Sequence, residues 1–233
     1  NAGIEVKETI VYDIATVDFA PIFNRAVNTG ADFIYVISSV NSQVVSSQYV
    51  KLQVPKVMTG VNVAALGQEY WEDTGGQGGG VSTLSPVPSV GFALDPKSKE
   101  FADKYVARYG DERPKFPHFN GFNAYWGVKQ AFAAAQEAGG FNNTTWVEAM
   151  GRQDMILEKD GQMWLRYGFW GKDEVEERTQ RTYPHNVRFD ISEPFDDGSP
   201  AMVVIQWYED GSAAVIYPDK YATGEFTIPS WVK

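Results

Sequence analysis

The stretch Asp32-Phe33-Ile34-Tyr35-Val36-Ile37-Ser38-Ser39-Val40-Asn41 decides the fold class that the sequence predicts. An unbroken run of β-branched and aromatic residues follows Gly30 and Asp32, and small hydroxyl and amide side chains end it. Such a run is typical of a parallel strand that helices cover on both faces. Open α/β sheets bind small ligands at the carboxyl ends of such strands. We therefore expect Ser38, Ser39 and Asn41 beside a solute.

The segments around this strand predict an alternation of strands and helices. A β-branched segment, 4–12, predicts a first strand, and a helix begins near Asp18 with Pro21 in its first turn. A second helix follows the central strand, over about 42–51, and a strand at 57–59 leads into Gly60-Val61-Asn62. Repeated βαβ units with right-handed crossovers place the chain in the α/β class.

The rest of the chain predicts further helices and a hairpin. Helical spacing and capping residues predict four helices, over 66–74, 96–109, 120–138 and 144–151. Short strands are expected at 81–84 and 163–165, and a hairpin joins 202–207 to 213–217 through the turn 209–212. The helix over 120–138 is apolar almost all round and needs burial on several sides. The glycines between 75 and 80 predict a mobile turn, because they lack the Gly-Lys-Ser/Thr ending of a phosphate loop.

Composition excludes several classes of function. The chain has 233 residues, 43% of them hydrophobic, which suffices for one large domain or two smaller ones. Its net charge of −10 argues against a nucleic-acid partner. Without cysteine there is no disulfide or thiolate site, and His118 and His185 have no second ligand at metal spacing. No nucleophile motif or cofactor fingerprint occurs, so we expect no catalytic residue, metal or cofactor.

Several short strings, in a fixed order, carry a family resemblance. They are Val17-Asp18-Phe19-Ala20-Pro21-Ile22 with Gly30-Ala31-Asp32-Phe33-Ile34-Tyr35-Val36, Tyr70-Trp71-Glu72-Asp73-Thr74-Gly75-Gly76, Phe101-Ala102-Asp103-Lys104-Tyr105 with Arg108-Tyr109-Gly110, Asn123-Ala124-Tyr125, and Val204-Ile205-Gln206-Trp207 with Asp210-Gly211. In this order the chain resembles the C-terminal two-thirds of a type I periplasmic binding protein of the branched-chain amino-acid and amide group, which serves ABC importers.

The resemblance implies two lobes, each an α/β sandwich with flavodoxin-like or Rossmann-like three-layer architecture. It assigns 4–115 to a second lobe, 116–200 to part of the first lobe, 201–217 to a hairpin that returns to the second lobe, and 218–233 to a C-terminal tail. Family residues that precede Ile4 would supply most of the first lobe. The chain is therefore expected to be a fragment, or to be completed by an N-terminal segment or by a second copy in a homodimer.

The resemblance also implies a function without catalysis. A small-molecule solute would be trapped between the lobes, in the periplasm or on the extracellular face of the membrane, and passed to the membrane permease of an ABC transporter. Its expected ligand-binding residues follow two strands and are Ser38, Ser39, Asn41, Ser42, Val61 and Asn62. Amino-acid binders of this family hold the ammonium group with an acidic residue near the position of Asn62. Because Asn62 carries an amide and no carboxylate, we expect an amide-like solute as an alternative to a branched-chain amino acid. Glu69 or Asp73 could still contribute a carboxylate.

Other functions remain open in the sequence. The same architecture serves as a ligand-sensing ectodomain of a signalling receptor. Thirty carboxylates and seven tryptophans could also form a glycoside hydrolase cleft, for example with Glu69 and Asp73 near Trp71. In a third reading, a stacking platform for sugars is formed by Trp71, Trp126, Trp164, Trp170 and Trp207. Tryptophans in helical and strand patterns are more often core residues.

Overall fold

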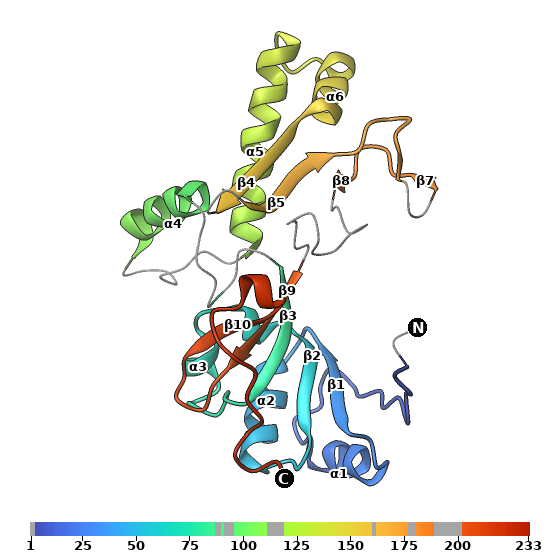
Figure 1. The fold of residues 1–233 in the computed structure, drawn as a ribbon, viewed down its shortest axis with the longest axis vertical. Helices are drawn as coiled ribbons and strands as arrows, with labels where there is room; N and C mark the ends of the chain where they lie inside the picture. Colours follow the sequence, from blue (N-terminus) through green and yellow to red (C-terminus); the bar gives the residue numbers. More distant parts are fainter. Residues whose placement is uncertain are drawn as a thin grey trace. The chain divides into compact units, whose positions relative to one another are not determined.

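The computed structural model describes residues 3–86, 90, 96–110, 119–159, 162–176, 180–188 and 202–233. The chain divides into two compact units (Figure 1). Unit 1 comprises Asn1–Ser85, Ser89–Phe92 and Val203–Lys233, and unit 2 comprises Pro86–Pro88 and Ala93–Met202. The expected lobe boundaries near 115 and 200 lie outside the described residues, so that assignment stays a prediction.

Unit 1 is built on a mixed five-stranded sheet with the order β1-β2-β3-β9-β10. Its strands are β1 (Phe33–Ser38), β2 (Val57–Asn62), β3 (Val81–Pro86), β9 (Met202–Trp207) and β10 (Ala213–Tyr217). β1 pairs with β2, and β2 with β3, in parallel, whereas β9 and β10 form an antiparallel hairpin. The α/β class, the strand that ends at Ser38 and the hairpin are confirmed, but β1 lies at an edge of the described sheet and not at its centre.

The helices of unit 1 begin and end where local chemistry sets their limits. They are α1 (Ala20–Asn28), α2 (Ser42–Lys51), η1 (Ala64–Leu66), α3 (Tyr70–Asp73) and η2 (Asp219–Tyr221). The Asp18 carboxylate accepts a hydrogen bond from the Ala20 N–H at the start of α1. The helix expected over 66–74 is shorter, because Gly67 takes an extended conformation with ψ 151° and separates η1 from α3.

The segment 4–12 does not form the expected strand. Val11 is 88% exposed, and Ile4 and Val6 are also exposed. A strand requires a backbone partner, yet none of residues 3–12 forms a backbone hydrogen bond with another described residue. The first βαβ unit of the chain is therefore β1-α2-β2, and the prediction of a preceding strand is wrong for these residues.

One face of β1 is covered and the other is open. Ile34 and Val36 pack into the main core of unit 1. Phe33, Tyr35 and Ile37 point to the opposite face and are 37%, 52% and 73% exposed. The expectation that helices cover both faces of this strand is therefore wrong, because α1 and α2 both supply side chains to the same core.

The main core of unit 1 is aromatic and draws on distant parts of the chain. Its buried members come from α1 and α2, from the residues that flank them and from the strands, and they are Phe19, Phe23, Val36, Val45, Tyr49, Val54, Met58 and Val81. The Trp231 ring contacts the Tyr49 ring at 5.7 Å, and its indole N–H donates to the Val54 carbonyl oxygen. The C-terminal tail therefore completes a core that begins at residue 19.

Unit 1 is expected to lose stability above pH 10. Burial raises the pKa of the Tyr49 and Tyr70 phenols above the ordinary value of 10.0. Below that value both states hold the proton. Above it the tyrosines of the unfolded state ionise first. The free energy of unfolding therefore falls by about 1 kcal/mol per tyrosine at about pH 11, and by more as the pH rises through the pKa of the folded state. Urea unfolding at about pH 8 and pH 11 tests this. An equal midpoint at both pH values for unit 1 would contradict it, and Tyr49→Phe should reduce the loss.

The glycine cluster forms turns, as the sequence predicted, and three of its glycines are packed closely in unit 1. Gly78, Gly79 and Gly80 are all buried. A Cβ on Gly78 would lie 2.6 Å from the Tyr70 ring, and one on Gly80 would lie 2.7 Å from Pro229. The cluster therefore allows the backbone to approach α3 and the C-terminal tail closely.

The described residues of unit 2 form three helices and an antiparallel sheet. The helices are α4 (Pro96–Tyr109), α5 (Phe119–Ala138) and α6 (Asn143–Arg152), and the sheet has the order β4 (Asp154–Lys159), β5 (Gln162–Phe169), β8 (Val187–Arg188). A separate pair is formed by β6 (Val175–Glu176) and β7 (Arg181–Thr182). The Asn142 side chain caps α6 by accepting from the N–H groups of Thr144 and Thr145.

The apolar helix α5 is buried on one side. Phe122 and Trp126 belong to a core with Ala102 of α4. Val128 and Phe132, one helical turn apart, are exposed. No helix among the described residues is long and apolar enough to span a membrane.

Candidate functional site

A layer of buried polar side chains lies at the carboxyl ends of β1 and β2, along β3 and in the first turns of α2. Its members are uncharged and almost without exposed surface, and they are Ser38, Ser42, Ser46, Asn62, Ser82, Thr83 and Ser85. Buried polar groups must find partners within the protein. Their hydrogen bonds therefore determine which of the expected ligand-binding residues are available to a solute.

Asn62, the last residue of β2, is fully buried at 0% exposure. Its amide N–H donates to the Ser46 hydroxyl of α2 at 2.7 Å, and its side-chain oxygen accepts from the Ala65 N–H at 3.3 Å. Its own backbone N–H donates to the Thr83 hydroxyl at 2.9 Å. Asn62 thus connects β2, β3, α2 and the loop after β2.

Ser38 and Ser42 are also buried and hold the same loops. The Ala64 N–H donates to the Ser42 hydroxyl at 2.9 Å, and the Val63 N–H donates to the Ser38 carbonyl oxygen at 3.0 Å. The Ser38 hydroxyl donates to the Val40 carbonyl oxygen at 3.3 Å. Both serines therefore fix the loop after β2 against the loop after β1.

The other three expected residues reach the surface of this edge. Ser39 is exposed, and Asn41 and Val61 are partly exposed. Asn41 takes a left-handed conformation with φ 55° at the start of α2, and its side-chain N–H donates to the Ile14 carbonyl oxygen at 3.0 Å. No side-chain hydrogen bond caps the N-terminus of α2. The six residues predicted from the sequence thus divide into a buried set and a surface set.

This edge of the sheet carries no charge of its own. None of the six residues is ionisable, and the described residues contain no group of three or more histidines and acids that could hold a metal ion. Glu69 precedes the single turn of α3, and the exposed Asp73 ends it. Polar recognition here therefore depends on hydroxyl, amide and backbone groups.

Two tryptophans that sequence reasoning offered as a sugar platform are core residues. Trp126 and Trp207 are buried in separate cores. The Trp207 indole N–H donates to the Ala65 carbonyl oxygen at 2.8 Å, which supports the loop after Asn62 from β9. The platform hypothesis is wrong for these two side chains, and Trp207 is a supporting residue that sequence reasoning missed.

Structural comparison shows the fold that this edge belongs to. A putative branched-chain amino acid ABC transporter protein from Silicibacter pomeroyi matches with TM-score 0.61 and 18% identity, over 94% of this chain and 52% of that one. A type 1 periplasmic binding protein from Bordetella pertussis has TM-score 0.57 and 18% identity, over 88% and 50%. A leucine binding protein from Thermotoga maritima has TM-score 0.53 and 18% identity, over 88% and 50%. The chain spans about half the length of these proteins.

The sequence itself gives one family match. No curated protein sequence matches the chain. The family model described as periplasmic binding protein matches residues 1–175, which is most of the 233 residues. The resemblance inferred from the short strings is confirmed, and the chain belongs to the periplasmic binding protein family.

Proposed function

We propose that the chain is a part of the extracytoplasmic solute-binding component of an ABC importer and binds a small polar solute, either a branched-chain amino acid or an amide-like molecule. The observation that carries the proposal is the uncharged polar edge at the carboxyl ends of β1 and β2 in a periplasmic binding protein. The solved relatives include proteins named for branched-chain amino acid transport and leucine binding, which supports this class of solute.

The division of the six residues suggests a division of roles. Ser39, Asn41 and Val61 reach the surface and contact the solute, whereas Ser38, Ser42 and Asn62 fix the loops that present them. A buried ammonium group requires a carboxylate partner. Since none of these residues is acidic, this edge binds the uncharged polar or apolar part of the solute.

The proposed cycle involves no bond chemistry. Solute binding shifts the population towards a closed form, and the loaded protein delivers the solute to a membrane permease. Membership of the periplasmic binding protein family supports a location in the periplasm or on the extracellular face of the membrane.

Ser39→Trp is expected to weaken solute binding by about tenfold or more. Ser39 is exposed beside Asn41, so an indole there would occupy the space that the proposed solute needs. The measurement is isothermal titration calorimetry of the full chain with leucine, isoleucine, valine and a set of small aliphatic amides. Native mass spectrometry of the purified chain reports any solute that it retains.

Asn24→Trp is the matched control, because Asn24 is exposed on α1 and outside the loops of the edge. It should bind as the unsubstituted chain does. Equal weakening by both variants, or Ser39→Trp binding as tightly as the unsubstituted chain, would contradict the proposed site. Turnover of a glycoside by the full chain would contradict the proposed function.

A further inference from the structure

The loop over residues 13–18, which precedes α1, lies against the residues proposed to bind the solute. The Asn41 side-chain N–H donates to the Ile14 carbonyl oxygen at 3.0 Å. Further along α2, the Gln48 side-chain N–H donates to the Val17 carbonyl oxygen at 2.6 Å. The loop is therefore held at two points, and one of the two side chains that hold it belongs to the proposed site.

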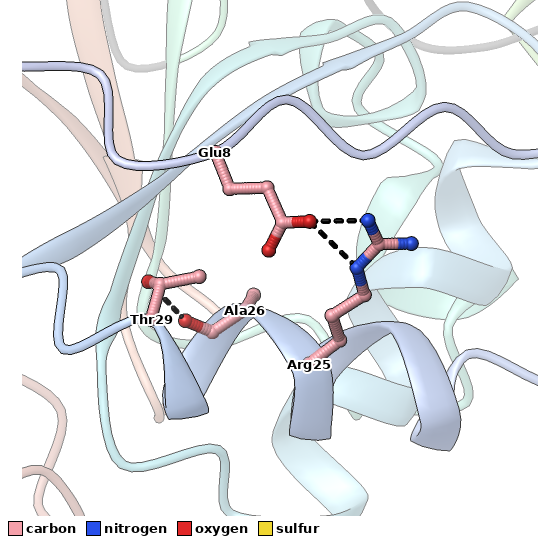
Figure 2. A network of polar contacts seen from close by, with 4 residues as sticks. All are labelled: Glu8, Arg25, Ala26 and Thr29. Carbon is pink, nitrogen blue, oxygen red and sulfur yellow. Dashed lines mark hydrogen bonds and ion pairs between the residues drawn. The ribbon is translucent and has the colours of Figure 1, made fainter.

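The chain around this loop is anchored as well. The Tyr12 ring packs edge-on against the Phe19 ring at a centroid distance of 5.2 Å. Glu8 accepts hydrogen bonds from the Arg25 guanidinium of α1, with Nε 2.8 Å from the carboxylate oxygen (Figure 2). Within the loop, the Asp13 carboxylate accepts from a backbone N–H two residues further on, at 2.8 Å. None of these contacts involves a solute, so the loop is preorganised and its side chains lose little freedom on binding.

The contact with Ile14 decides which end of the Asn41 amide is available to a solute. A carbonyl oxygen only accepts hydrogen bonds, so the Asn41 nitrogen faces it and the Asn41 side-chain oxygen faces away. No described residue donates to that side-chain oxygen. Asn41 therefore offers an acceptor at the partly exposed surface of the site, which suits an N–H group of the solute.

The same contact brings apolar side chains to this acceptor. Ile14 is 65% exposed, and Val40, which directly precedes Asn41, is 47% exposed. Single exposed apolar residues are common on protein surfaces. These two belong to different loops that the Asn41 side chain joins, beside the exposed Ser39. An apolar group next to a hydrogen-bond acceptor suits a solute that carries an aliphatic group close to its N–H.

We propose that Ile14 is a specificity-determining residue that contacts the aliphatic group of the solute, and that Asn41 is the residue that positions it. This inference rests on the proposed function and narrows it, because the solute must then carry both an N–H donor and an aliphatic group of several carbons. Aliphatic amides and branched-chain amino acids meet both requirements, whereas formamide and urea lack the aliphatic group. Each methylene group buried against Ile14 should strengthen binding about fourfold.

The test is isothermal titration calorimetry of the full chain with acetamide, propionamide, butyramide and isovaleramide, which differ only in their aliphatic group, and with leucine. Affinity for the unsubstituted chain should rise along the amide series. Ile14→Ala should weaken isovaleramide and leucine about tenfold and leave acetamide within about twofold, because only the longer groups reach the carbons that are removed. An equal loss for every amide, or an unchanged series, overturns the inference.

Val17→Ala is the matched control. Val17 is β-branched like Ile14, is 73% exposed on the same loop and is also held through its carbonyl oxygen by a side-chain amide. Because Gln48 holds it further along α2, away from Asn41, this variant should keep the whole rise of affinity along the series. Equal losses in Ile14→Ala and Val17→Ala overturn the inference.

Asn41→Asp tests the positioning role. An aspartate keeps an acceptor oxygen but cannot donate to the Ile14 carbonyl. Hydrogen exchange should therefore accelerate in 13–18, and the rise of affinity along the uncharged amides should become shallower. A full rise of affinity in this variant overturns the positioning role.

Ser39→Trp separates this inference from the proposed function. If Ser39→Trp weakens every member of the series and Ile14→Ala weakens none, the inference is overturned and the proposed function stands. If neither leucine nor any of the amides binds to the unsubstituted chain, both are overturned.

Discussion

Gly60→Ala is expected to lower the free energy of unfolding of unit 1 by about 3–5 kcal/mol. Gly60 lies in β2 opposite Val36 of β1, in a backbone conformation with φ +130°. A Cβ there would lie 2.1 Å from the Val36 carbonyl oxygen, which no side-chain movement relieves because the obstacle is backbone. The substitution would therefore separate β2 from β1 at the end of the strands that carries Asn62.

Urea unfolding followed by tryptophan fluorescence measures this effect, since Trp71, Trp207 and Trp231 belong to unit 1. Gly30→Ala is the matched control. Gly30 also has a positive φ, of +72°, but nothing lies within 4 Å of its added Cβ. Gly30→Ala should lower the free energy of unfolding by only about 1–2 kcal/mol, because only the backbone conformation opposes it. Equal losses in the two variants would show that the close approach of β2 to β1 is not the cause.

Asn62→Leu is expected to destabilise unit 1 by about 2–4 kcal/mol. The leucine side chain is similar in size but accepts and donates no hydrogen bond. The Ala65 N–H would lose its acceptor and the Ser46 hydroxyl would lose its donor, inside a region where Asn62 is fully buried. The loop after β2 would then lose the support of Asn62 and keep only the hydrogen bond from the Ala64 N–H to the Ser42 hydroxyl of α2 as its described polar contact with that helix.

Two readouts separate the structural role of Asn62 from a direct solute contact. Urea unfolding should show the loss of stability in the absence of any solute, and hydrogen exchange should accelerate in the loop 63–66. Asn24→Leu, exposed on α1, should leave both unchanged. A fully stable Asn62→Leu variant that has lost only solute binding would instead make Asn62 a direct ligand contact.

The main elements of unit 1 could be predicted from local chemistry. Pro21 and Asp18 mark the start of α1, the run ending at Ser38 marks β1, and Asp210-Gly211 marks the turn of the hairpin. These signals depend on neighbours in the sequence. β4 depends instead on pairing with a strand, and the division between η1 and α3 depends on the backbone conformation of Gly67. The sequence therefore did not predict either of them.

The wrong predictions concern contacts between segments that lie far apart in the sequence. Residues 4–12 have the composition of a strand but no backbone partner among the described residues, and the open face of β1 could not be distinguished from a covered one by its apolar run. Similarly, the position of Asn62 at the end of a strand predicted a place in the site. Its complete burial follows from Ser46 and Ala65, which approach only in the folded chain.

The position of Trp231 against Tyr49 has a consequence for how the protein is made. Residues 203–233 supply β9, β10 and the tail that closes the core around Tyr49, whereas β1 and β2 are synthesised long before them. Unit 2 is encoded between these parts, so a ribosome releases it while unit 1 still lacks part of its sheet. Unit 1 can therefore complete its fold only after synthesis of the chain to residue 231, and until then its parallel strands lack the tail that covers Tyr49.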